Sequence, residues 1–321
     1  MLLQPVEPAG LHTLSNGQSI ALPPPDEFYA QLVLRQRGLI PPDDQQRLRT
    51  STILIAGCGS IGGSVVEPLV RLGAERLMLA EPDGYDLHNL NRQSARLQDL
   101  GRNKAEVLQE RLRDINPYAS IEVHSRGIVP DNVEALLARA ALVVDGVDVT
   151  NSSARRNKVL LHEQARRFGL PVVSGYDIAG LQLLQIYDYR SRGVAALDGR
   201  VSLHAVDRLD TLEFLERIIP KSALPYEMIP ELRRRLAGEQ GSFPQLVYTA
   251  QLFGVLAARV ILDLLAGRAV QRRVMVDVCG VVRPAHVRLR IGVARLLGLF
   301  RLSRELRAAR RGRKLATLRQ G

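Results

Sequence analysis

The chain has 321 residues, 46% of them hydrophobic, which is enough for one large or two modest domains with an ordinary core and excludes global disorder. Trp is absent and aromatic residues make up 4%, so aliphatic side chains must fill that core. The net charge of +11 lies mostly in residues 288–321, where eleven Lys or Arg and one acid give 11 − 1 = +10, leaving 11 − 10 = +1 for the rest. The basicity therefore belongs to the tail and not to the folded body.

The cysteine content indicates the cellular compartment and limits the kinds of metal site that the chain can form. Only Cys58 and Cys279 are present, which argues against a disulfide framework and favours a reducing cytoplasm. No C-x-x-C pair occurs, so we expect no four-thiolate zinc site. The first residues do not resemble a signal peptide. The most apolar stretch, residues 246–266, carries Arg259 and Asp263, so we expect a buried helix there and not a membrane span.

Residues 1–50 predict an N-terminal arm followed by helices. Residues 1–25 are rich in proline and show no periodicity, which predicts a loose arm. Helical spacing follows at residues 27–37, and a second, short helix is predicted at residues 43–50 after the break at Pro41-Pro42.

Residues 51–175 alternate between short apolar β-runs and helical patterns. This order predicts an α/β fold with a Rossmann-like, doubly wound, mostly parallel sheet that carries helices on both faces. We expect Pro68 to kink or shorten the helix that contains it. The predicted strands are residues 52–56, 76–80, 120–124, 141–145 and 171–174. The predicted helices are residues 61–72, 103–115, 132–139 and 154–168.

Residues 176–285 predict the second half of the same fold, which we expect to face the substrate. One or two strands are expected at residues 181–189, a helix at 245–265 and a late strand at 273–278. Between them, residues 190–245 mix short helical pieces with prolines and predict an insertion or crossover region that covers the site.

A glycine-rich turn directly follows the first strand of residues 51–175 and opens a helix. Its glycines allow a tight turn and close approach of the backbone to a phosphate, and the helix start supplies a positive end. Glu81, at the end of the second strand, is a carboxylate that accepts hydrogen bonds from ribose hydroxyls. Alone, this signal fits NAD, FAD and ATP equally. The turn consists of Gly57, Cys58, Gly59, Ser60, Ile61 and Gly62.

A series of polar residues follows in a fixed order. It runs through Asp83, Asn89-Leu90-Asn91-Arg92-Gln93, Gly101-Arg102-Asn103-Lys104 and Asp145-Gly146-Val147-Asp148. The series resembles the superfamily of ubiquitin-activating enzymes and their bacterial relatives, the ThiF-type adenylyltransferases. That family's pattern is a glycine loop, an acidic ribose residue, N-x-x-R-Q, G-x-x-K and a strand ending in D-x-x-D. Every element is present, in order, over residues 53–148.

The resemblance implies a role for each matching residue. It implies that Glu81 holds the ATP ribose and that Asp83 and Gln93 belong to the same nucleotide site. It implies that Asn89, Arg92 and Lys104 contact the triphosphate and that Asp148 binds Mg²⁺, with Asp145 orienting or sharing the ion. Arg92, Lys104 and Asp148 are therefore the expected catalytic residues. Arg35 matches an N-terminal arginine that reaches the ATP of a neighbouring subunit, and by resemblance we expect a homodimer.

The chemistry agrees with this assignment. A carboxylate nucleophile, with an unperturbed pKa of roughly 4, is already ionised at neutral pH and needs no general base. The carboxylate must approach the negatively charged triphosphate of ATP, and fixed cations and Mg²⁺ reduce the repulsion between the two anions. We therefore expect ATP- and Mg-dependent adenylation of a carboxylate on a ubiquitin-like or sulfur-carrier protein, a peptide or a small molecule, with release of pyrophosphate.

The sequence departs from many relatives and leaves alternatives open. Residues 149–278 contain no cysteine, and Val149 stands where sulfur-carrier activators usually have Asn. A thioester on the enzyme is therefore not expected, and the adenylate would pass to an external sulfur donor, an amine or a nucleophile within the substrate. One alternative function is a tRNA-modifying dehydratase that cyclises a carboxylate-bearing adenosine. Another is a non-catalytic nucleotide-binding or NAD/FAD-binding protein.

The tail, residues 286–321, predicts a basic amphipathic helix. Leu296, Leu297, Phe300 and Leu306 recur at helical spacing among arginines. Such a helix contacts an anionic membrane surface, tRNA or a partner, or packs on the body with one face in solvent. The tail contains Phe300 but no Tyr or Trp, so stacking on bases would be weak.

Overall fold

The computed structural model describes residues 10–14, 16–239, 241 and 243–318, with side chains described as far as residue 308. Its strands are β1 Leu11–Thr13, β2 Ser19–Ala21, β3 Thr52–Ala56, β4 Arg76–Ala80, β5 Ser120–His124, β6 Leu142–Asp145, β7 Pro171–Ile178, β8 Leu181–Asp188 and β9 Arg273–Asp277. Its helices are α1 Pro25–Leu32, α2 Pro42–Thr50, α3 Gly62–Arg71, α4 Lys104–Arg113, α5 Val133–Leu137, α6 Ser152–Arg167, α7 Leu203–Val206, α8 Thr211–Ile218, α9 Met228–Leu236, α10 Val247–Leu265, α11 Val278–Val282 and α12 Ala285–Leu318.

The central element is a seven-stranded sheet in the order β5-β4-β3-β6-β7-β8-β9. The five strands from β5 to β7 are parallel, and β8 and β9 extend the sheet in antiparallel fashion. The predicted mostly parallel, doubly wound sheet is therefore confirmed. Because β3 is flanked by β4 on one side and β6 on the other, the chain order reverses there, and open α/β sheets bind ligands at such a point.

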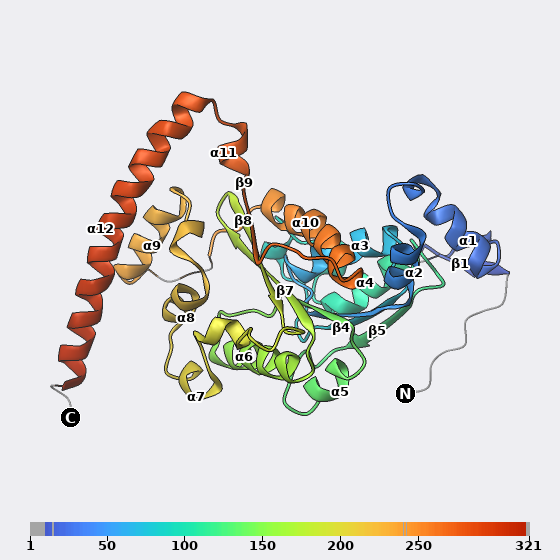
Figure 1. Cartoon of the computed structure of the whole chain (residues 1–321), viewed down its shortest axis with the longest axis horizontal. Coiled ribbons are helices and arrows are strands. Elements are labelled where there is room, and N and C mark those ends of the chain that lie inside the picture. The colour runs from blue at the N-terminus through green and yellow to red at the C-terminus, as the bar shows by residue number, and fades with distance from the viewer. Residues whose placement is uncertain (1–9, 15, 240, 242, 319–321) are drawn as a thin grey trace.

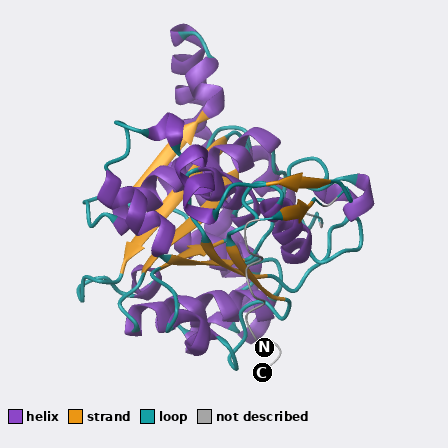
Figure 2. Cartoon of the chain, turned by 90° about the vertical axis from the view of Figure 1, so that its right-hand side faces the viewer, coloured by secondary structure: helices purple, strands orange, loops and turns teal. Residues whose placement is uncertain are grey.

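The inner strands of the sheet, β3, β4, β6, β7 and β8, are buried on both faces, which explains their apolar runs. In β3, Ile53 and Ile55 share a core with residues of α3, α4 and α10, whereas Leu54 and Ala56 share a second core with residues of α5 and α6. Side chains alternate across a strand, so each face has its own apolar layer. Figure 1 shows α3 and α10 on one side of the sheet and α5 and α6 on the other, and Figure 2 shows the strands between helices.

Helix α10 is a core helix that packs on α3, β7 and β8. Among the described residues it is the one helix long and apolar enough to cross a membrane, and just over half of that span is buried inside the protein. Pro68 lies inside α3 and has no N–H for the Ser64 carbonyl, and Gly254 of α10 lies against that carbonyl. A Cβ at Gly254 would collide with it, so this glycine sets how closely the two helices approach.

The N-terminal arm differs from the prediction. Residues 1–9 lie outside the described residues, but β1 and β2 form an antiparallel pair that closes through Gly17, whose φ is +83°. Asn16-Gly17 is a turn dipeptide, and the sequence prediction overlooked it among the prolines. The predicted helix at 27–37 is also shorter: α1 ends at Leu32, and a 3₁₀ turn, Leu34–Gln36, follows.

The insertion and the tail form a helical layer beside the sheet. Helices α8 and α9 belong to the predicted insertion, and α12 runs alongside α9 at the left edge of Figure 1. A Cβ at Gly298 of α12 would lie 2.9 Å from Ile229, so the helices are close there. Arg233 and Glu305 join them through two hydrogen bonds of 2.9 and 2.7 Å. The outward side of α12 carries a row of exposed apolar side chains, called here the outer row: Leu289, Val293, Leu296, Leu297 and Phe300.

We expect Gly254→Ala to lower the unfolding free energy by about 1–3 kcal/mol, because its Cβ would collide with the backbone of α3. Gly292→Ala, on α12, is the matched control, because a Cβ there meets nothing within 4 Å and alanine favours a helix by roughly 0.5–1 kcal/mol over glycine. Urea unfolding of both variants measures the difference. Equal stability of the two would contradict the proposed tight packing of α10 on α3.

Candidate active site

A cavity of about 970 Å³ opens at the carboxyl ends of β3, β4, β6 and β7. Its volume lies at the upper end of the roughly 300–1,000 Å³ typical of ligand sites. One end is formed by the glycine turn, the end of β4 and the loop after β6. The other end is formed by α8, α9, residue 243 and α12. The cavity thus joins the strand ends to the helical layer.

The cavity gathers most of the residues that the sequence predicted for a nucleotide site. The predicted residues that line it are Gly57, Gly59, Ser60, Ile61, Glu81, Asp83, Asn89, Arg92, Gln93, Lys104 and Asp148. Gly62 and Arg35 are not part of the lining. Gly62 lies beneath the turn, where a Cβ would collide with the Gly57 carbonyl, and Arg35 lies in the 3₁₀ turn after α1. The reach of Arg35 into a neighbouring subunit stays a prediction.

The glycine turn is held by backbone contacts on its inner side. The Gly57 N–H donates to the Ala80 carbonyl at 2.8 Å, and the Gly146 N–H donates to the Ala56 carbonyl at 2.8 Å. Gly57 has a φ of +88°, and a Cβ there would collide with the Gly146 carbonyl. The outer side is open, since a Cβ at Gly59 would meet only Gln93, at 3.7 Å. A phosphate can therefore approach the turn from the cavity.

Glu81 ties this turn to the end of β4. Its Oε2 accepts a hydrogen bond of 2.6 Å from the Cys58 N–H, and its Oε1 accepts one of 3.0 Å from the Asp83 N–H. Burial raises the pKa of Glu81, and the Lys104 charge opposes that rise. Each carboxylate oxygen keeps a second lone pair, so Glu81 retains the capacity to accept a ribose hydroxyl. Cys58 is fully buried and burial raises its pKa well above the usual value, so it is not poised as a nucleophile.

Two cations lie at this end of the cavity. Lys104 is the first residue of α4, behind Asn103, whose Oδ1 caps the helix by accepting from the Ala105 N–H at 2.9 Å. Lys104 is only 8% exposed, with Nζ 3.9 Å from Asp83 Oδ2. Arg92 is fixed through Nη1, which donates to the His88 carbonyl at 3.1 Å, and burial lowers its pKa. Neither cation extends freely into solvent.

Asp148 and Asp145 have different roles, which corrects one expectation. Asp148 is exposed to the cavity, and its Oδ1 accepts hydrogen bonds from the N–H groups of Val149 and Thr150. Mg²⁺ is usually bound by one or two carboxylates, waters and substrate phosphates, and Asp148 fits that donor set. Asp145 is fully buried and turned away from the cavity, so it is not placed to share the ion.

Asp145 instead anchors a buried polar network. Its Oδ2 lies 2.5 Å from Lys158 Nζ, 3.0 Å from His162 Nε2 and 2.6 Å from Ser174 Oγ. Burial alone would raise the pKa of Asp145, but Lys158 and His162 hold it well below its usual range. His162 Nδ1 lies 2.8 Å from Tyr189 Oη, which extends the network to the turn after β8. The carboxyl end of β6, which carries the loop with Asp148, is thereby fixed to α6, β7 and this turn.

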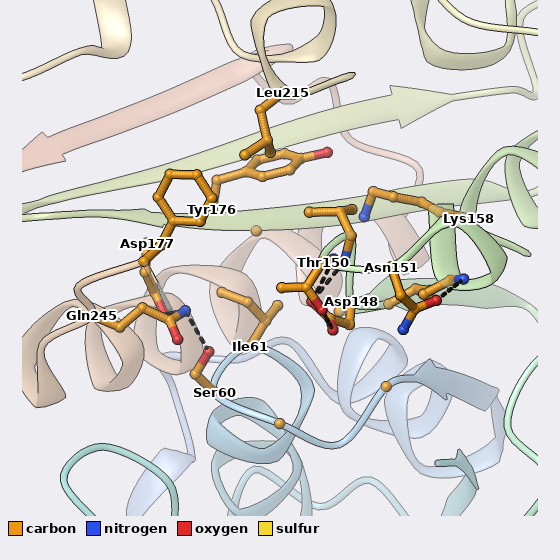
Figure 3. A pocket seen from close by; sticks show the side chains of 18 of the residues that line it. Ser60, Ile61, Asp148, Thr150, Asn151, Lys158, Tyr176, Asp177, Leu215 and Gln245 are labelled. Carbon is orange, nitrogen blue, oxygen red and sulfur yellow. Dashed lines mark hydrogen bonds between the residues drawn. The ribbon is translucent and has the colours of Figure 1, made fainter. Parts of the chain in front are cut away.

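The structure adds functional candidates that the sequence did not reveal. Asp177 faces the cavity from the end of β7, and Gln245 Nε2 lies 3.3 Å from both Asp177 Oδ2 and Ser60 Oγ (Figure 3). Burial raises the pKa of Asp177 to about 6, against the Ser60 hydrogen bond and the Arg92 charge, which lower it. The sequence prediction ended this strand at residue 174, and β7 continues to 178, which hid the position of Asp177.

Several polar atoms around the cavity are buried without a partner. Among the described residues these include Arg92 Nε, Gln93 Oε1 and Asp177 Oδ1. Buried polar atoms in native proteins nearly always have a hydrogen-bond partner. Three unpaired atoms on one cavity wall therefore indicate a polar ligand or ordered water between them.

The far end of the cavity is apolar. Half-buried leucines from α8, α9 and α12 face it, and we call them the leucine wall: Leu215, Leu232, Leu236, Leu299 and Leu306. Glu213, Glu216 and Lys221 also border this part. The sequence prediction placed the insertion over the site and grouped Leu306 with Leu296, Leu297 and Phe300 as one apolar face of the tail. In the structure Leu306 faces the cavity, whereas the other three are exposed.

Comparison with known proteins agrees with this geometry. Residues 33–189 match the family model described as the ThiF family. The chain is 32% identical over 151 residues to the sulfur carrier protein adenylyltransferase of Thermus thermophilus, covering 47% of this chain and 53% of that one. It is 34% identical over 129 residues to the tRNA threonylcarbamoyladenosine dehydratase of Haemophilus influenzae, covering 38% and 49%. The chain thus spans about half the length of these curated relatives.

The fold is similar to that of solved structures. The E. coli tRNA N6-threonylcarbamoyladenosine dehydratase in complex with ATP aligns over 75% of this chain and 96% of that one, with a TM-score of 0.53 and 22% identity. At this identity the likeness concerns the fold alone. The family predicted from the motifs is confirmed for residues 33–189, whereas the roles of individual site residues stay predictions.

We expect Lys158→Met to destabilise the chain by about 3–5 kcal/mol, because it leaves the Asp145 charge buried without its main partner. Arg156→Met, two residues earlier on α6, removes an exposed ion pair with Asp207 and should cost at most ~1 kcal/mol. The double variant Asp145→Asn with Lys158→Met should recover part of the loss. Urea unfolding at neutral pH measures all three, and a small effect of Lys158→Met alone would contradict the network.

Asp177 should make stability depend on pH. Its pKa is about 6 in the folded chain and roughly 4 when unfolded, so wild-type stability falls as the pH rises through that window. Asp177→Asn has no charge to bury and should exceed the wild type by roughly 1–3 kcal/mol at pH 8 but not at pH 4. Chemical unfolding at both pH values tests this, with surface Asp131→Asn as control. The same difference at both pH values would show that ionisation of Asp177 is not the cause.

Proposed function

Residues 33–189 belong to the ThiF family, and on that premise we propose that the chain is an ATP-dependent adenylyltransferase that activates a carboxylate as its acyl-adenylate. The observation that carries the proposal is the meeting of Arg92, Lys104 and Asp148 around one cavity beside the glycine turn. Sequence positions 92, 104 and 148 come from three separate elements, so their convergence is a property of the fold.

The reaction requires positioning and charge neutralisation. A carboxylate oxygen of the substrate attacks the α-phosphorus of ATP, a new P–O bond forms, and the bond to the β-phosphate oxygen breaks with its electron pair leaving on pyrophosphate. The glycine turn receives phosphate oxygens through backbone N–H groups, while Glu81 accepts the ribose hydroxyls. Lys104 and Arg92 offset the charge that builds up as two anions approach.

Mg²⁺ would be held by Asp148, and when bound it neutralises phosphate charge and orients the leaving pyrophosphate. To hold the ion, Asp148 needs a fixed loop, and the Asp145 network fixes the start of that loop at the end of β6. The hydrogen bonds from Val149 and Thr150 restrain the Asp148 carboxylate. Its Oδ1 already accepts from both N–H groups, whereas its Oδ2 accepts only from the Thr150 hydroxyl and keeps a lone pair for the ion.

The alternative functions differ in the groups that they require around the cavity. An NAD- or FAD-binding protein has no need of two cations and a carboxylate around the phosphate end. A tRNA dehydratase would use the same adenylation step, so the phosphate end supports both. The far end of the cavity is lined mainly by leucines, whereas an RNA ligand would need polar and basic contacts there, and we therefore place a non-RNA carboxylate first. The cytoplasmic location and the homodimer stay predictions.

Calorimetric titration with Mg-ATP tests the phosphate end. Lys104→Met should weaken binding roughly 10- to 100-fold, because a buried charged hydrogen-bond donor is lost. Arg113→Met, at the other end of α4, should leave the affinity unchanged. Asp148→Ala should abolish the gain in ATP affinity that Mg²⁺ provides, and should abolish exchange of labelled pyrophosphate into ATP with any carboxylate that supports it. Stabilisation by NADH or FAD with indifference to Mg-ATP would sink the proposal.

A further inference from the structure

The cavity has two ends of different chemistry. The phosphate end carries the glycine turn, Arg92, Lys104 and Asp148, whereas the far end carries the leucine wall. Tyr176 and Leu215 lie where the two ends meet, with Asp148 on one side of the cavity and Asp177 on the other (Figure 3). The two ends belong to one continuous cavity, so a ligand held at the phosphate end has an apolar space beside it.

The leucine wall is a built structure and not a gap between loose helices. Arg233 and Glu305 join α9 to α12, and Arg295 of α12 donates at 2.6 Å to the carbonyls of Leu224 and Ser222. Arg283 and Glu227 add an ion pair of 2.5 Å near the start of α12. These polar bonds fasten the helices to one another. Leu299 and Leu306 remain half-buried and face the cavity without filling it.

The apolar end offers little to a polar ligand. Among the described residues that line this end, the charged side chains are Glu213 and Glu216 of α8 and the exposed Lys221, and Ser303 of α12 is a further polar one. Glu213 already accepts from the Asp210 N–H at its helix cap. A peptide needs partners for its backbone N–H and C=O groups when it is buried, and leucine side chains supply none. A hydrocarbon chain has no polar groups and needs no such partners.

We propose that the carboxylate activated at this site is an aliphatic acid with a long unbranched chain, whose carboxylate lies beside the α-phosphate of the ATP held at the glycine turn and whose chain lies along the leucine wall. The inference rests on the proposed function and names its substrate class. Acyl-adenylate formation then proceeds as written above, with the fatty acid supplying the attacking oxygen and no further reactant. Each methylene that enters the wall should strengthen binding roughly fourfold.

The test uses the full chain with dodecanoate, hexanoate and glycylglycine as probes. Equilibrium dialysis of labelled probe in the presence of AMP measures binding, and exchange of labelled pyrophosphate into ATP measures activation. We expect dodecanoate to bind at least ~100-fold more tightly than hexanoate, given the gain per methylene. Glycylglycine should neither bind nor support exchange.

Three variants connect the effect to the leucine wall. Leu299→Gln should weaken dodecanoate binding by at least tenfold and leave Mg-ATP binding unchanged. Leu296→Gln is the matched control on the same helix, because Leu296 is 67% exposed and lies in the outer row. Leu215→Gln, on α8, repeats the test from another element in case the first variant misfolds, which thermal unfolding would reveal.

The outcomes separate this inference from the proposed function. Equal loss with Leu296→Gln and Leu299→Gln, or no dependence on chain length, would overturn the substrate class. Exchange supported by glycylglycine and not by dodecanoate would also overturn it and leave adenylation standing. Chain-length-dependent dodecanoate binding without exchange would overturn the proposed function and, with it, the assignment of dodecanoate as substrate.

Discussion

Three glycines make the site possible because they allow backbone to meet backbone. Gly57, Gly62 and Gly146 lie against one another where β3, α3 and β6 converge, and a Cβ at any of them would crowd the others. Without side chains there, the first turn of α3 lies directly above the end of β6. The glycine turn and the loop with Asp148 are thereby held at one place. The positions of Glu81, Arg92 and Lys104 relative to the glycine turn and to Asp148 depend on this contact.

Charge is distributed to match that geometry. The charged pair deepest in the protein, Asp145 with Lys158, is satisfied internally and serves to hold the end of β6. The charges that face the cavity, Arg92, Lys104 and Asp148, are held by backbone groups, by neutral side chains or, for Lys104, by a carboxylate 3.9 Å away, so a charged ligand can still pair with them. Buried charges without strong partners are unfavourable, so such groups gather where a ligand completes them. The buried network and the charges at the cavity thus both follow from the cost of burying a charge without a partner.

The sequence predicted what is local and missed what is not. The parallel sheet followed from alternating β-runs and helical patterns. The glycine turn and Glu81 followed from a motif within one βαβ unit, and Lys104 followed from the motif that opens the next helix. Asp177 was missed because its neighbours, Ser60 and Gln245, are far from it in the sequence. Leu306 was grouped with Leu296, Leu297 and Phe300 because they recur at helical spacing, but the helical period does not show which apolar residues meet the body. Asp145 and Asp148 share a motif, and only burial distinguishes them.

Helix α12 has a property that follows from its two apolar faces. One face contributes Leu299 and Leu306 to the cavity, and another presents the outer row to its surroundings. When a contact on the outer row orders α12, a ligand that binds in the cavity loses less conformational entropy in ordering the same helix. By reciprocity, the bound ligand favours the contact on the outer row by the same free energy. The two faces are therefore thermodynamically linked through one helix, without any change in the shape of the sheet.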